Sequence, residues 1–132
     1  MDLSSLLEMT LRFLLAAALG AGIGYQRERA GKAAGMRTHI LVCSGAALFT
    51  LVSLYGFNGP TVAAGVVAGI GFIGAGVIFR GMRGEGVAGL TTAASMWAAA
   101  AIGLAAGTGM YLLSVIATAV TVGVLFLPKV RG

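Results

Sequence analysis

The sequence predicts an all-α fold, a polytopic membrane bundle of five transmembrane helices. Apolar residues make up 58% of the 132 residues and charged residues only 10%, against about 25% charged residues in a typical soluble domain. The mean hydropathy is +0.98, and the apolar residues fall into five stretches. A soluble protein this small must cover its surface with polar side chains. We therefore exclude a soluble enzyme, a DNA-binding module and a disordered tail.

Each apolar stretch is close to the about 20 residues that a helix needs to cross a bilayer. The five stretches are residues 6–25, 38–55, 61–79, 87–104 and 109–127. The breaks between them are the charged run 26–32, the Gly-, Asn- and Pro-containing turn 56–60, the run 80–86 and the short segment 105–108. Gly, Asn and Pro are typical turn residues. We expect residues 1–132 to form one transmembrane domain.

The basic residues predict the orientation of this domain. If the chain crosses the membrane five times, eight of the nine Lys and Arg residues fall on one side: Arg27, Arg29, Lys32, Arg37, Arg80, Arg83, Lys129 and Arg131. Because cytoplasmic loops are rich in Lys and Arg, the N-terminus is expected outside and the C-terminus in the cytoplasm. The leader carries Asp2 and Glu8 rather than the basic region of a signal peptide, so we expect a retained first helix.

The net charge of +5 could also suggest a nucleic-acid partner. In a chain this apolar, clustered basic residues rather indicate contact with lipid headgroups. We therefore expect the lipid bilayer as a partner and no nucleic acid.

The 22 glycines predict close helix packing. Gly20 and Gly24 form a small-residue pair in the first helix, and Gly65 and Gly69 form another in the third. Small residues let membrane helices approach closely, which also suits a homo-oligomer. Residues 69–74 spell G-x-G-x-x-G, but a dinucleotide site needs a strand, a turn and a helix start. In the middle of a membrane span we interpret these glycines as packing positions: Gly69, Gly71 and Gly74.

Polar residues within the predicted spans each leave two interpretations open. Glu8 and Arg12 share a helix face as an (i, i+4) pair. Arg12 either extends toward the outer interface beside Glu8 or forms a buried ion pair facing a cavity. The hydroxyl groups either bond to carbonyls of their own helices or line a polar path; they are Ser95, Ser114 and Thr118, with Thr91 and Thr121 at related spacings.

The cytoplasmic end of the first helix gathers charge. Glu28 lies between Arg27 and Arg29, which predicts either an interfacial salt-bridge network or a contact or gating site. His39 and Cys43 are four residues apart and share a helix face. Two ligands are too few for a structural zinc site, so we expect packing and polar contacts, with no metal and no cofactor. The sequence offers no Ser/His/Asp, Cys/His or paired-carboxylate arrangement, and we expect no enzyme.

Three segments resemble one family of membrane proteins, the MgtC/SapB family. GYQRERAGKAAGMRTH (24–39) resembles its first cytoplasmic loop, VAGIGFIGAGVI (67–78) its third helix, and GLTTAASMW (89–97) the opening of its fourth. The resemblance covers most of residues 11–127 in the order of the family. The positions that match the family pattern are Glu28, Arg29, Arg37, Thr38, His39, Cys43, Thr91 and Thr92.

The resemblance implies a bacterial inner-membrane protein with five spans. It implies a regulatory role in magnesium homeostasis and adaptation to low magnesium, associated with virulence in pathogens, through contact with another membrane protein complex. The alternative is a small transporter or channel for an ion or small solute. The stretch 58–65 departs from the family, because it lacks the usual acidic residue, Arg and Gln near the start of the third helix. The resemblance covers the membrane domain alone, without the soluble domain that many members carry.

Overall fold

The described part of the protein consists of five α-helices and one π-helix, joined by short loops. The structure, a computed structural model, describes residues 2–85 and 89–128, with the side chains of 80–85 left out of the description. The helices are α1 (Leu3–Arg29), α2 (Met36–Leu51), the π-helix η1 (Val52–Gly56), α3 (Thr61–Glu85), α4 (Leu90–Gly107) and α5 (Tyr111–Leu125). The described part contains no strand, and the prediction of an all-α, five-helix fold is confirmed.

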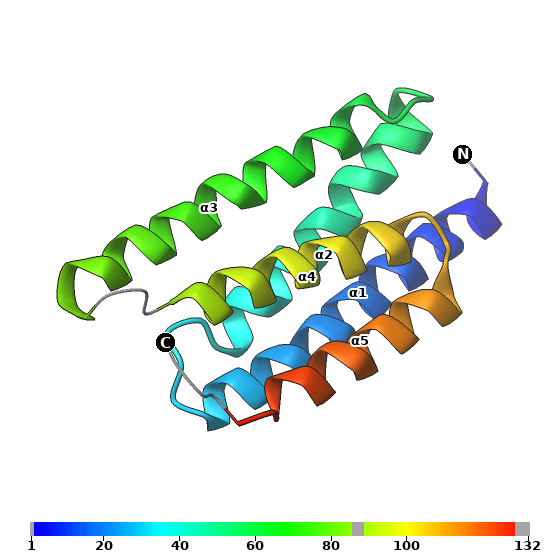
Figure 1. The fold of residues 1–132 in the computed structure, drawn as a ribbon. Coiled ribbons are helices and arrows are strands. Elements are labelled where there is room, and N and C mark those ends of the chain that lie inside the picture. Colours follow the sequence, from blue (N-terminus) through cyan, green and yellow to red (C-terminus); the bar gives the residue numbers. More distant parts are fainter. Residues whose placement is uncertain (1, 86–88, 129–132) are drawn as a thin grey trace.

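The helices alternate in direction and form one bundle (Figure 1). The helices α1, α2 and α4 pack against one another at its centre. The helix α5 packs on α1 and α4, whereas α3 packs mainly on α4 and diverges from α2 beyond the loop that joins them (Figure 1). The buried core between the central helices consists of small and aliphatic residues: Ala16, Ile23, Cys43, Ala47, Ala99, Ile102 and Ala106.

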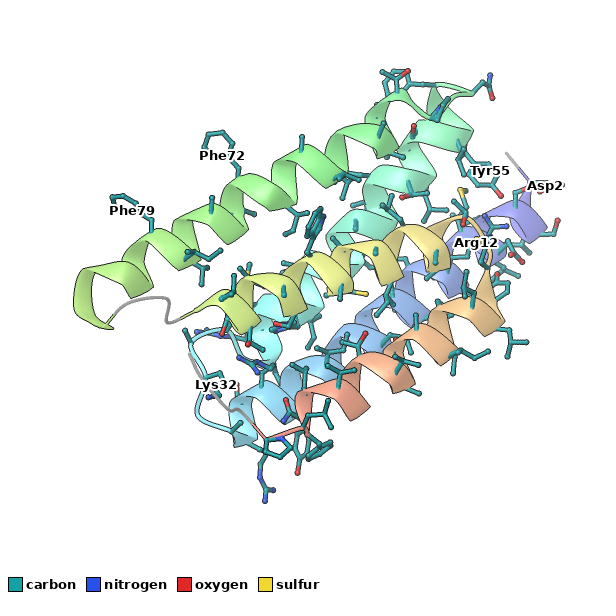
Figure 2. All side chains as sticks on the ribbon, viewed as in Figure 1. Asp2, Arg12, Lys32, Tyr55, Phe72 and Phe79 are labelled. Carbon is teal, nitrogen blue, oxygen red and sulfur yellow. The ribbon has the colours of Figure 1, made fainter. Side chains whose placement is uncertain are left out.

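Four of the helices are long and apolar enough to cross a membrane. The fifth, α5, has 15 residues, and at 1.5 Å per residue it rises about 22 Å, less than the roughly 30 Å hydrocarbon core. Large hydrophobic side chains are exposed around the bundle, as on a surface that faces lipid. Figure 2 shows Phe72 and Phe79 on α3 pointing away from the other helices, with exposed fractions of 86% and 70%.

The ends of two helices are fixed by carboxylates. The Ser5 amide donates to Asp2 Oδ1 at 2.9 Å and so caps α1. The Met36 amide donates to Glu28 Oε1 at 3.2 Å, at the start of α2. Such acceptors satisfy amides that have no partner in the first helical turn.

A hydroxyl group joins the end of α2 to the start of α3. Ser53, which lies in η1 and is fully buried, donates to the carbonyl of Gly59 and accepts from the Ala63 amide, the latter at 3.2 Å. This side chain therefore ties the turn at 56–60 to both helices.

The third helix extends beyond its apolar span. The predicted span 61–79 matches the apolar segment Thr61–Phe79, but α3 continues through Glu85. The fall in hydropathy at Arg80 therefore marks the end of the apolar span rather than the end of the helix.

The glycine pair of α1 packs as predicted. A Cβ at residue 20 would lie 2.5 Å from the His39 carbonyl oxygen, and a Cβ at residue 24 would lie 2.5 Å from Met36 Cα. Both distances are shorter than a Cβ can tolerate, so Gly20 and Gly24 permit α1 and α2 to approach closely. The glycines of α4, Gly103 and Gly107, do the same against α2, a contact that the sequence analysis did not identify.

Of the α3 glycines predicted to pack, only Gly74 packs within the described part of the chain. Gly65, Gly69 and Gly71 have no atom within 4 Å of the place that a Cβ would occupy, whereas Gly74 lies 3.4 Å from Ala93 Cβ by the same measure. The G-x-G-x-x-G segment lies in the middle of α3. Because α3 diverges from α2, only one side of this glycine-rich helix packs within the chain.

Candidate functional site

A buried arginine lies where α1 ends. Arg27 is 3% exposed, because it continues the packed face of α1 that Gly20, Ile23 and Gly24 begin. One guanidinium nitrogen, Nη2, donates to Thr92 Oγ1 in α4 at 2.8 Å. The Nε atom is buried and has no hydrogen-bond partner among the residues that the structure describes.

His39 lies beside this arginine and joins α2 to α4. Its Nδ1 is 2.9 Å from the Gly35 carbonyl oxygen, and its Nε2 is 2.9 Å from Ser95 Oγ. Ser95 Oγ in turn donates to the Thr92 carbonyl at 2.7 Å. We call Arg27, His39, Thr92 and Ser95 the Arg27 cluster.

The three hydrogen-bond contacts of His39 and Ser95 need more donor hydrogens than a neutral His39 and the Ser95 hydroxyl supply. The Gly35 and Thr92 carbonyls can only accept, and Ser95 has a single hydroxyl hydrogen. If Ser95 donates to Thr92, both ring nitrogens of His39 must donate, which requires the imidazolium form. A neutral imidazole satisfies only two of the three contacts. Because His39 is fully buried near the charge of Arg27, the neutral ring is favoured, with Nδ1–H donating to Gly35 and Nε2 accepting from Ser95.

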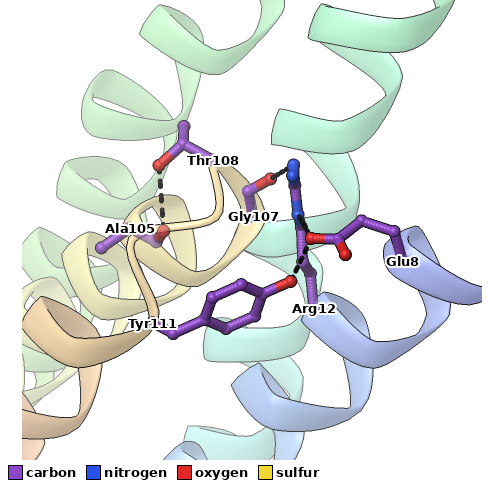
Figure 3. Close-up of polar contacts among 6 residues, drawn as sticks. All are labelled: Glu8, Arg12, Ala105, Gly107, Thr108 and Tyr111. Atoms are coloured by element: carbon purple, nitrogen blue, oxygen red, sulfur yellow. Dashed lines mark hydrogen bonds and ion pairs between the residues drawn. The ribbon is translucent and has the colours of Figure 1, made fainter. Parts of the chain in front are cut away.

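A second polar cluster lies at the end of the bundle that carries Asp2 (Figure 2), and Figure 3 draws its contacts. Arg12 Nε lies 2.9 Å from Glu8 Oε2, and Arg12 Nη1 donates to the Gly107 carbonyl at 3.1 Å. The hydroxyl of Tyr111 donates to the same Glu8 oxygen, and the guanidinium lies 5.7 Å from the ring centroid of Tyr55. Figure 2 shows Tyr55 and Arg12 at the end of the bundle that carries Asp2, away from Lys32. We call Glu8, Arg12 and Tyr111 the Arg12 cluster.

The ion pair of Arg12 with Glu8 lies within α1, and the guanidinium also contacts α4. Its side chain is only 14% exposed, and its bond to Gly107 satisfies a carbonyl at the end of α4. A cation at a helix C-terminus also complements the helix dipole. Arg12 thereby joins α1 to α4, and Tyr111 adds α5.

The charged residues around Glu28 do not form the predicted network. In the part of the chain whose side chains are described, the ion pair is Glu8–Arg12, and Glu28 instead caps α2. Arg29 Nη1 donates to the Tyr25 hydroxyl at 3.0 Å. Glu28, Arg29 and Arg37 are all exposed.

The remaining predicted residues divide by burial. Cys43 and Thr92 are buried, Thr38 is half-buried and Thr91 is exposed. Most of the predicted hydroxyls bond to carbonyls of their own helices, as the first interpretation held. These bonds run from Ser95 to Thr92, from Ser114 to Tyr111, from Thr118 to Ser114 and from Thr121 to Ala117. Within the described residues, no three His, Cys, Asp or Glu side chains come together to hold a metal ion.

Two site residues, Arg27 and Gln26, were not predicted from the sequence. Gln26 is buried, and its Nε2 donates to the Leu125 carbonyl at the end of α5 at 3.2 Å. A signal for Arg27 was present, because it lies three residues after Gly24 and seven after Gly20, on the same helix face. A face that starts with packed glycines continues as a packed face.

Comparison with known proteins assigns the chain to a family. The model of the MgtC family matches residues 13–131. The Escherichia coli (strain K12) protein named "Putative magnesium transporter YhiD" is 44% identical over 89% of this chain and 59% of its own length. Protein SrpB of Synechococcus elongatus is 42% identical over 85% of this chain and 70% of its own length.

Protein MgtC of Salmonella typhimurium is 45% identical over 82% of this chain and 47% of its own length. The chain thus spans about half to two thirds of the length of these relatives, and no solved structure matches it. With four apolar helices long enough to cross a bilayer and a family match over nearly its whole length, the chain is a membrane protein and belongs to the MgtC family.

Proposed function

We propose that the chain is a non-enzymatic regulatory protein of the bacterial inner membrane, which acts in magnesium homeostasis and adaptation to low magnesium through a membrane protein partner. Family membership supports the link to magnesium, since the name of the Escherichia coli relative attributes magnesium transport to that protein in provisional terms. The orientation follows from the basic loops, with the N-terminus outside and the C-terminus in the cytoplasm.

One observation favours regulation over magnesium transport through a single protomer. An arginine faces the inside of the bundle at each end, Arg12 at one and Arg27 at the other. Between them lies the core of Ala, Ile and Cys side chains. A fixed positive charge is an electrostatic barrier to cations in a pore, and an apolar core gives a hydrated ion no ligands. A magnesium ion would meet both obstacles along the axis of the bundle.

The exposed charges at the basic end are the proposed partner surface. Glu28, Arg29, Arg37 and Thr91 are exposed, whereas His39 and Thr92 are buried and could not touch a partner directly. In a strain that lacks the native protein, Arg37→Gln is expected to insert and fold but not to restore growth at low magnesium. Ala33, exposed in the same loop, gives the control variant Ala33→Ser. Full complementation by Arg37→Gln would show that this surface is wrong.

The open glycine face of α3 supports a homo-oligomer. Gly65 and Gly69 are four residues apart on one face of α3, where a Cβ would meet no described atom within 4 Å, and glycines in membrane helices commonly mark contacts between helices. Cys43, the single native cysteine, is fully buried. In membranes, Gly69→Cys is therefore expected to form a disulfide-linked dimer upon oxidation, whereas Leu112→Cys on the exposed side of α5 is not. Equal crosslinking of both variants would refute a specific α3 interface.

The second candidate function is transport, which the name of YhiD favours. A path between protomers would avoid both arginines, so transport would depend on the oligomer. Magnesium flux into liposomes containing crosslinked Gly69→Cys protein separates the two functions. Regulation predicts no flux in either the crosslinked or the uncrosslinked form.

A further inference from the structure

The first turn of α4 presents amides without a capping side chain. The residue before the helix is Gly89, whose φ is +95° and which has no side chain to cap the turn, and no cap from another described side chain is present. Although the Ala93 amide donates to the Gly89 carbonyl at 2.9 Å, the amides of residues 90–92 precede the first bonds of the helix. Such amides carry the positive end of the helix dipole and favour an anion.

The buried guanidinium of Arg27 contacts the same turn. The Arg27 side chain reaches Thr92, the third residue of α4, through the 2.8 Å bond from Nη2. Arg27 is only 3% exposed. Among the described residues, its Nε has no hydrogen-bond partner and no carboxylate pairs with it. Burying an arginine without a counter-ion is costly, so its position calls for an anion at this place.

We propose that the N-terminus of α4 and Arg27 form a binding site for a phosphate group. A helix N-terminus and an arginine fork are the two donor types that recognise phosphate best in proteins. Leu90 and Thr91 are exposed, so the first turn lies at the surface of the described part of the bundle. The phosphate belongs either to a lipid headgroup or to a free phosphate anion. The site is independent of whether the protein regulates or transports.

The first test uses the unaltered chain in dodecyl maltoside micelles, which contain no phosphate. The amide resonances of residues 90–92 and the Arg27 Nε resonance are followed by 15N NMR, while inorganic phosphate is added at constant ionic strength against chloride. A parallel titration uses short-chain phosphatidylglycerol. Saturable shifts at these resonances with either ligand support the site, and the ligand that produces them identifies the source of the phosphate.

Two outcomes would overturn the proposal. One is the lack of any shift at these resonances with both ligands. The other is a shift confined to the exposed Arg29, Lys32 and Arg37, which would indicate a diffuse basic surface. Glu85 is the nearest acidic residue in the sequence before α4, and its side chain is not described. If phosphate binds only after Glu85→Gln, that carboxylate occupies the place and the proposal fails.

Variants measure the contribution of the arginine. Arg27→Gln is expected to weaken phosphate binding about tenfold or more, the usual effect of losing a charge-assisted hydrogen bond. The matched control is Arg29→Gln, which removes the same charge two residues later from an exposed position. Equal weakening in both variants would contradict the site. The NMR titration of the unaltered chain decides the question if Arg27→Gln does not fold.

Discussion

Gly20→Ala is predicted to destabilise the bundle because its methyl group has no space. The new Cβ would lie 2.5 Å from the His39 carbonyl oxygen, 2.9 Å from Cys43 Cβ and 3.0 Å from Ile40 Cα. Two of these three atoms belong to the backbone of α2, so they cannot rotate away and α2 must shift as a whole by about half an ångström or more. Overpacking of this kind costs about 1–3 kcal/mol.

The matched control for Gly20→Ala lies on the other side of the same helix. Gly22 has nothing within 4 Å of the place of a Cβ, and Ala favours a helix over Gly by about 0.5–1 kcal/mol. Gly22→Ala should therefore be neutral or stabilising. Reversible unfolding in mixed micelles with increasing SDS, followed by far-UV circular dichroism, gives both free energies of unfolding. Equal values for the two variants would refute the close packing of α1 on α2.

Three further predictions concern polar groups. Ser95→Ala removes the hydroxyl that joins α2 to α4 and should lower the free energy of unfolding by about 1–2 kcal/mol. The control Thr91→Ala, at an exposed position, should leave it unchanged. Equal losses in both variants would contradict the hydrogen-bond network of Ser95. Arg27→Met removes a buried charge and, in phosphate-free micelles, should leave the free energy of unfolding unchanged or raise it. A loss of more than about 1 kcal/mol would argue against an uncompensated charge at Arg27. The control is Arg29→Met, at an exposed position. The Ser5 amide bond lowers the pKa of the Asp2 carboxyl, so the cap is stabilising above the ordinary pKa of about 4 and is lost as the pH falls through the lowered value. The chemical shift of the Ser5 amide should follow that titration, and Asp2→Asn should abolish it; an unchanged titration would contradict the cap.

The helices could be predicted from the sequence because hydropathy reports each segment separately. The apolar stretches and the turn at 56–60 correspond to features of the fold, whereas α4 continues through Gly107 and takes in most of the predicted break at 105–108. The end of α3 could not be predicted in this way, because hydropathy measures the apolar span, which ends at Phe79, and not the helix, which continues through Glu85.

The site was only partly predictable, because contacts between helices depend on the orientation of each helix about its own axis. His39 and Thr92 were identified, but their joint contact with Arg27 and Ser95 requires three helices to meet. Arg29 matched the family pattern, yet the packed face of α1 selects Arg27 instead. Likewise, the spacing of Gly65 and Gly69 suggested packing without showing whether the contact lies inside the chain.

The Arg12 contact to α4 was not predictable for the same reason. The spacing of Glu8 and Arg12 indicates a pair within α1, and that pair is present. The bonds to the Gly107 carbonyl and from the Tyr111 hydroxyl cross more than ninety residues of sequence. They depend on the packing of α1 between α4 and α5.

The measurement that tests the central claim most directly is magnesium entry into proteoliposomes that hold the purified protein, a magnesium dye inside and a set membrane potential. Protease accessibility of the termini and circular dichroism establish orientation and folding in the same preparation. With an arginine facing inward at each end of an apolar core, a regulatory protein should give no saturable entry above that of empty liposomes. Saturable magnesium entry that Arg12→Ala or His39→Ala abolishes would contradict regulation and make the protein a transporter.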